Sequence, residues 1–243
     1  MMIANVRAQL SREDAQLVLR LVSRGRPEQA RAAETTLADR GLDPLLDDPE
    51  LLRALIGARQ SAHASLPLFC YVVVRHALRR TGSDSRRLAD YAAGVLLHFG
   101  LRERARRLSE SDDQTYDTIA RIAEDVESAD SERAFLARAH LGNYALWISG
   151  VFPDHIEHRR WRRGGPDLGY YESMGQRGFR LAADHRLASR HGLAPLYDEA
   201  AQAFPKMRRA LNAVSDTLLF RHVHTPERLM RQVRDAFDND RLS

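Results

Sequence analysis

Apolar residues recur along this chain every three to four positions, the spacing that places them on one face of an α-helix. The first such segment follows Ser11, which has the character of an N-cap. Proline opens later segments and glycine closes several of them, as is usual for helices. In the first hundred residues, the pattern predicts five helices, which begin near Ser11, Pro27, Asp48, Leu66 and Asp84.

The same spacing continues after residue 115. It predicts an amphipathic helix with Ile119, Ile122, Ala123 and Val126, a long helix from Ser131 to Ser149, and a short helix from Pro153 to Arg163. A break at Gly164-Gly165-Pro166 precedes a helix from Tyr170 to Asp184, and Pro205 is expected to interrupt or kink a helix from Pro195 to Phe220. A last amphipathic helix begins at Pro226 and carries Leu229, Val233 and Phe237 on its apolar side.

No run of alternating apolar and polar residues is long enough for a buried sheet. We therefore predict an all-α fold, a compact bundle of about nine to eleven helices with no significant sheet. An α-solenoid is the alternative, but no repeat of 30 to 45 residues supports it. We expect one domain over residues 1–243. A weak subdivision into halves 1–108 and 115–243 is the alternative, because the strongly charged stretch after residue 102 interrupts the apolar pattern.

The amino-acid composition argues against several classes of protein for this chain. Apolar residues make up 44% of the chain, enough for a buried core, and the single cysteine, Cys70, excludes an intrachain disulfide. The N-terminus, Met1 to Gln9, has no apolar stretch of signal-peptide length, and no apolar run reaches the roughly 20 residues that span a bilayer. We therefore predict a soluble protein of the bacterial cytoplasm, with no membrane insertion.

Charge does not by itself indicate a nucleic-acid partner. The 37 basic residues comprise one lysine and 36 arginines, a bias that resembles the codon usage of a GC-rich genome. The formal net charge is only +4, and acidic residues are interspersed along the chain. Proteins that bind nucleic acid concentrate basic residues on one face, so nucleic-acid binding is an alternative that we do not favour.

Polar side chains interrupt the otherwise apolar helix around residue 140. His140, Asn143, Tyr144 and Trp147 follow the spacing i, i+3, i+4, i+7 and so share one stripe. The simpler interpretation is a hydrogen-bonded network in the core. The functional interpretation is a polar ligand pocket within residues 135–172, to which Tyr171 and Glu172 fold back from the following helix. The small residues Gly142, Ala145 and Ser149 on the neighbouring stripe favour close packing of another helix.

Two further clusters follow directly. The first is a candidate metal site, which consists of Asp154, His155, Glu157 and His158 at the start of a helix. The simpler interpretation is that its carboxylates suit the helix N-terminus. The second is an arginine run that could bind anions around Trp161, or could be a solvated helix end, and its members are Arg159, Arg160, Arg162 and Arg163.

Common enzyme motifs are missing from the sequence: there is no P-loop, no dinucleotide-binding glycine pattern, no nucleophile elbow and no HExxH. We therefore predict a soluble all-α binding or protein-interaction protein, whose partner is an unidentified protein or small molecule. The first alternative is a helical-bundle enzyme or sensor with a metal or another small cofactor, which the sequence does not specify. The weaker alternative is an anion or nucleic-acid binder that uses the arginine run at 158–163.

Overall fold

The structure is a computed structural model that describes residues 5–57, 64–100, 107–108, 118–126 and 132–240. These residues form fourteen α-helices, a short 3₁₀ turn at Arg7–Gln9 and a π-helical turn at Ser215–Leu219, and they contain no strand. The all-α prediction is therefore confirmed. The helices outnumber the expected nine to eleven because two short helices, α3 and α11, escape the pattern and because one predicted helix is divided in two.

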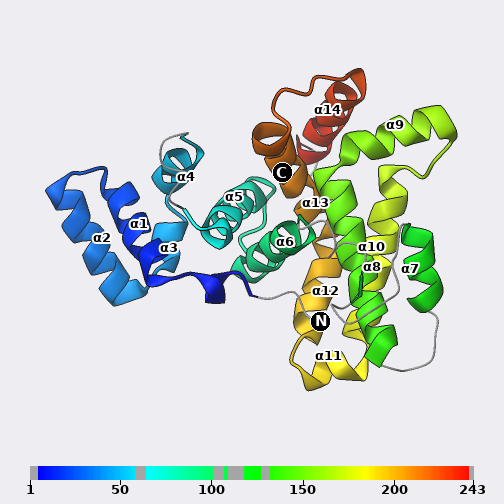
Figure 1. Cartoon of the computed structure of the whole chain (residues 1–243), viewed down its shortest axis with the longest axis horizontal. Coiled ribbons are helices and arrows are strands. Elements are labelled where there is room, and N and C mark those ends of the chain that lie inside the picture. The colour runs from blue at the N-terminus through cyan, green and yellow to red at the C-terminus, as the bar shows by residue number, and fades with distance from the viewer. Residues whose placement is uncertain (1–4, 58–63, 101–106, 109–117, 127–131, 241–243) are drawn as a thin grey trace.

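Four helices lie at one end of the molecule (Figure 1): α1 (Arg12–Ser23), α2 (Pro27–Arg40), α3 (Asp43–Leu46) and α4 (Pro49–Ile56). Local signals set their starts. Ser11 Oγ accepts a hydrogen bond from the Asp14 amide at 3.1 Å, and the Asp14 carboxylate accepts one from the Ser11 amide at 2.9 Å. This reciprocal capping box satisfies two of the amides that the first helical turn leaves without partners.

The middle of the molecule consists of α5 (Leu66–Arg80) and α6 (Arg86–Phe99) (Figure 1). Every residue from Cys70 to Leu78 is buried. Within this run, the Arg75 guanidinium donates to Asp47 at 2.7 Å and to Asp84 at 2.6 Å. Helix α6 starts one residue later than predicted, because the Ser85 side chain is the cap that accepts a hydrogen bond from the Leu88 amide at 3.2 Å.

The rest of the chain surrounds the long helix α8 (Glu132–Val151), which packs against α6, α7, α10 and α13 (Figure 1). The other helices of this part are α7 (Ile119–Val126), α9 (Pro153–Arg163), α10 (Leu168–Ala183), α11 (Arg186–Arg190), α12 (Ala194–Gln202), α13 (Phe204–Val214) and α14 (Pro226–Asp240). The predicted helix over Pro195–Phe220 is two helices. Pro205 lies in the first turn of α13, where its missing N–H is not needed, and α12 ends at Gln202.

Helices α8 and α10 approach closely because two glycines face each other. A Cβ atom on Gly178 would lie 2.7 Å from the Gly142 amide nitrogen, and a Cβ on Gly142 would lie 2.3 Å from the Phe179 ring. The small residue at Gly142 therefore serves close helix packing, as the sequence favours. The buried apolar side chains form one continuous cluster that runs from Val6 to Val214. Among the described residues, no helix is long and apolar enough to cross a membrane.

Candidate functional site

The Asn143 side chain points into the protein core. Its Oδ1 accepts a hydrogen bond from the Tyr91 hydroxyl of α6 at 2.5 Å. Burial raises the pKa of Tyr91 well above its ordinary value, so this hydroxyl stays protonated and acts as a donor. The Tyr91 ring also contacts Phe179 and Tyr197 edge to face, at 5.8 and 6.1 Å between ring centroids. Asn143 thus belongs to a hydrogen-bonded core of the kind that the simpler interpretation predicts.

The other aromatic members of the predicted stripe pack around the end of α6. The centroid of the Phe99 ring lies 5.5 Å from the buried imidazole of His140 and 6.0 Å from Trp147. Tyr144 lies 6.3 Å from His140, and Trp147 contacts Phe152 edge to face at 5.1 Å. His140, Tyr144 and Trp147, which share the stripe described above, therefore lie together in an aromatic cluster.

Tyr171 and Glu172 of α10 have different surroundings. Tyr171 is buried, and burial raises the pKa of its hydroxyl, although the charge of Arg159 on α9 acts to lower it. Glu172 accepts a hydrogen bond from Arg208 Nε of α13 at 2.5 Å. The six predicted pocket residues thus pack against several helices, with Asn143 held by α6 and Glu172 held by α13.

Arginine side chains form ion pairs with both carboxylates of the predicted metal cluster. Asp154 accepts hydrogen bonds from Arg228 Nε at 2.7 Å and from Arg231 Nη2 at 3.2 Å. Glu157 is almost fully buried, and its oxygens lie 3.9 Å from Arg160 and 3.7 Å from Arg234.

The two histidines of the cluster, His155 and His158, are exposed. Partial loss of water around its ring, together with the charge of Arg159, lowers the pKa of His155. Among the described residues, no three His, Cys, Asp or Glu side chains gather closely enough to hold a metal ion. The structure therefore offers no support for a metal site at residues 154–158.

Helix α9 is held firmly where it leaves α8. The last carbonyls of a helix lack partners within the helix. Here Asn212 Nδ2 donates to the carbonyls of Ser149 and Gly150 at 2.8 and 2.7 Å, and Ser215 Oγ donates to the carbonyl of Val151 at 2.7 Å. Side chains of α13 and the π-helical turn thus satisfy the last carbonyls of α8, directly before α9 begins.

A network of buried arginines ties α9 and α10 to the end of the chain. Arg208 bridges Glu172 and Asp235, and Arg231 bridges Asp154 and Asp216. Both guanidinium groups are buried. The network could not be predicted from the sequence, because nothing in the sequence distinguishes these two arginines from the other 34 of the chain. The presence of arginine on the polar side of an amphipathic helix does not reveal which side is buried.

The second half of α9, by contrast, extends beyond the neighbouring helices (Figure 1). All seven residues from His158 to Gly164 are exposed. Trp161 has 66% of its surface exposed, and the Arg160 guanidinium lies 5.9 Å from the centre of its ring. Within the described part of the chain, Arg159, Arg162 and Arg163 form no ion pair. The arginine run is thus a solvent-facing surface with unpaired cations beside an exposed indole.

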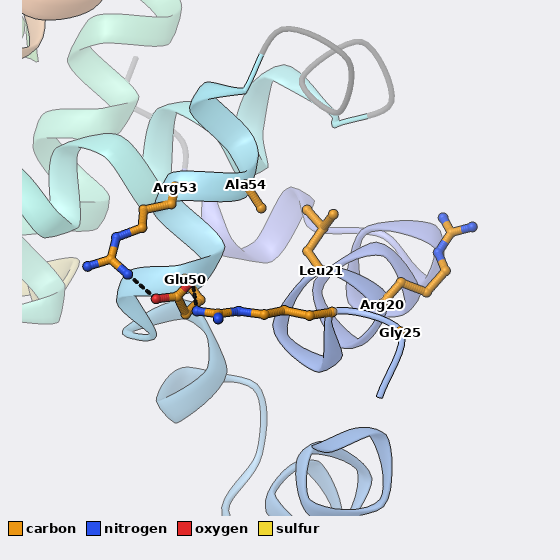
Figure 2. A pocket seen from close by; sticks show the side chains of 7 residues that line it. Arg20, Leu21, Gly25, Glu50, Arg53 and Ala54 are labelled. Carbon is orange, nitrogen blue, oxygen red and sulfur yellow. Dashed lines mark hydrogen bonds and ion pairs between the residues drawn. The ribbon is translucent and has the colours of Figure 1, made fainter. Parts of the chain in front are cut away.

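A cavity of about 490 Å³ lies between α1 and α4, away from the predicted sites (Figure 2). Its lining includes Arg20, Arg24, Glu50 and Arg53. Arg24 and Arg53 both form ion pairs with Glu50, whereas the Arg20 side chain extends away from them (Figure 2). Because the only carboxylate of this cavity is already paired, the cavity offers weaker recognition chemistry than the exposed half of α9.

No protein-family model, no curated protein and no solved structure matches this chain, so its function has to be inferred from its own residues.

Proposed function

We propose that this chain is a binding protein that recognises an acidic segment of a protein partner through the exposed half of α9, from His158 to Gly164. One observation carries the proposal. Four arginines of this segment face solvent, three of them without any ion pair in the described structure, next to a tryptophan that is 66% exposed.

The chemistry of these side chains suits a carboxylate-rich partner. Guanidinium groups bind carboxylates through two parallel hydrogen bonds and keep their charge at any physiological pH. An exposed tryptophan supplies a large apolar surface that gains stability when a partner covers it. Tryptophan and arginine are also the residues most enriched among those that dominate binding energy at protein interfaces.

The base of α9 supports the same proposal. The first half of the helix is fixed by Asp154, which is ion-paired to Arg228 and Arg231. A partner that binds the second half therefore meets a helix whose backbone is already ordered, so that only its side chains lose conformational freedom. This preorganisation favours recognition over a purely solubilising role for the arginines.

An acidic protein segment fits this surface better than nucleic acid does. The exposed half-helix is only about 9 Å long, from the six helical residues His158–Arg163 at 1.5 Å each. Nucleic-acid binding proteins usually present a longer basic face that contacts many phosphates, and the formal net charge of this chain is only +4.

Fluorescence of Trp161 provides a direct test. The chain has two tryptophans, so a Trp147→Phe background makes Trp161 the sole indole reporter. We expect titration with a poly-glutamate peptide to change its emission, with an affinity that falls as salt increases. Replacement of Arg159, Arg160, Arg162 and Arg163 by glutamine should weaken this binding by at least about tenfold, since each tenfold step corresponds to 1.4 kcal/mol of lost interaction.

The matched control removes the same charge elsewhere. Exposed arginines of α1 and α2 are changed to glutamine, and they are Arg12, Arg20, Arg31 and Arg40. Retained binding in this variant supports recognition by α9, whereas equal weakening in both variants would mean unspecific attraction and would contradict the proposal. Tighter binding of a thymidine oligonucleotide than of poly-glutamate, lost in the α9 variant, would replace the proposal with nucleic-acid binding.

A further inference from the structure

Helix α14 has its apolar side turned toward solvent. Leu229, Met230 and Val233 share one face of the helix, at spacing i, i+1, i+4, and their surfaces are 63%, 57% and 47% exposed. A surface helix of a globular protein ordinarily buries such a face and exposes its charges. We call these three residues the α14 stripe.

The opposite face of α14 is the one that packs against the protein. Arg228 and Arg231 are buried and form ion pairs with Asp154 and Asp216. Arg228 also donates to the carbonyls of Phe220 and Val223, at 2.7 and 2.8 Å. These contacts fix the rotation of the helix, so that the α14 stripe points away from the described residues of the chain, none of which covers it.

We propose that the α14 stripe is the contact surface of a homodimer, in which α14 of one copy packs antiparallel against α14 of a second copy. The charged residues beside the stripe favour a second copy of this chain as the partner. Glu227 and Arg234 are seven residues apart and therefore lie on the same flank of the helix. In an antiparallel pair centred between residues 230 and 231, Glu227 of each copy faces Arg234 of the other. The Arg234 side chain is half exposed and lies 3.7 Å from Glu157 of its own chain, so its remaining N–H groups can also pair with Glu227 of the second copy.

The same flank disfavours other arrangements of two copies. A parallel pair would set Glu227 against the opposite flank, where Gln232 is neutral and offers no positive charge to a carboxylate. The antiparallel pair has the twofold symmetry that most homodimers share, since each residue contacts its counterpart in a reciprocal way. Three apolar side chains per copy form a small interface, so we expect a dissociation constant on the order of 10–100 µM.

Sedimentation velocity of the full-length protein over about 5 to 300 µM tests the dimer, because its population depends on concentration. We expect the average sedimentation coefficient to rise with concentration. Leu229→Glu should weaken self-association by at least about tenfold, because it places a charge in the buried centre of the interface. The matched control is Leu66→Glu, which changes a leucine that is 65% exposed on α5, and this variant should dimerise normally.

A charge reversal tests the ion pair of the antiparallel geometry. Glu227→Arg should weaken the dimer by about two- to fivefold, as is typical of rim ion pairs, whereas Glu227→Asp, which keeps the negative charge, should leave it nearly unchanged. Circular dichroism establishes that each variant remains folded.

A protein that stays monomeric at the highest concentration would overturn the proposal. So would a dimer that Leu229→Glu leaves intact, and so would a monomer that instead binds anionic phospholipid vesicles through α14. Failure of poly-glutamate binding at α9 would leave this dimer unaffected, because the two surfaces consist of different residues.

Discussion

The close packing of α8 on α10 predicts a strong effect of Gly178→Ala. The new Cβ atom would lie 2.7 Å from the Gly142 amide nitrogen and 2.9 Å from the Arg138 carbonyl oxygen. Both are backbone atoms, which cannot rotate out of the way as a side chain does. The two helices would have to separate along one of the most extensive helix contacts of the fold.

Two effects of opposite sign determine the expected change in stability. Alanine stabilises a helix by about 1 kcal/mol relative to glycine. Overpacking of a close-packed interior costs about 1–3 kcal/mol, and contact with rigid backbone belongs at the upper end of this range. The expected net loss is therefore about 2 kcal/mol. With an m-value of about 3 kcal/mol per M, the urea midpoint should fall by about 0.7 M.

Urea denaturation followed by circular dichroism at 222 nm measures this shift. The matched control is Gly169→Ala in the same helix, where the new Cβ would come no closer than 3.4 Å to any neighbouring atom. Gly169 is exposed, so this variant should be as stable as the parent protein or slightly more stable. If Gly178→Ala raised the midpoint as Gly169→Ala does, the proposed backbone contact between α8 and α10 would be wrong.

Three further predictions concern buried polar groups. Tyr91→Phe removes the donor to Asn143 and should lower the unfolding free energy by about 1–3 kcal/mol, measured by urea denaturation; an unchanged midpoint would show that the bond contributes nothing. Arg231→Met removes one of the two arginines that pair with the half-buried Asp154 and Asp216, whereas Arg228 still contacts both, so it should cost about 1–3 kcal/mol, with faster amide hydrogen exchange throughout α14; unchanged exchange would refute the anchoring role. Burial lowers the pKa of the His76 imidazole below its ordinary value of 6.5. As the pH falls, this imidazole is therefore protonated more readily in the unfolded chain than in the folded one, and the stability of the fold decreases. His76→Leu should therefore lose less stability than the parent between about pH 7.5 and 5.5, and equal losses would contradict this assignment.

Helix positions were predictable because local chemistry sets them. Ser11, Pro27 and Ser65 lie at or next to the first residues of α1, α2 and α5, and each acts through contacts within four residues along the chain. The division between α12 and α13 follows from Pro205, but the sequence alone left open whether this proline kinks the helix or ends it. That choice depends on what surrounds the following helix.

The candidate sites were predictable as clusters of residue types, but their partners were not. The stripe through His140 and Asn143 was recognisable from its spacing, whereas the donor to Asn143 lies 52 residues away in the sequence. The acidic and histidine cluster at 154–158 resembled a metal site because its spacing is right for one. Arginines of α14 form ion pairs with its carboxylates, and no local sequence pattern indicates these distant partners.

Short-range chemistry along the chain is enough to predict that this protein is helical, where most helices begin and end, and that residues 158–163 carry a dense positive charge. These properties depend on backbone propensities, caps and spacing, all of which act over a few residues. Which face of each helix is buried depends instead on contacts between distant segments. In α14 these contacts place Arg231 inside and Leu229 outside, the reverse of what hydropathy favours, because paired carboxylates from distant segments offset the cost of burying the arginine. The same ion pairs anchor the base of α9 and leave the α14 stripe exposed.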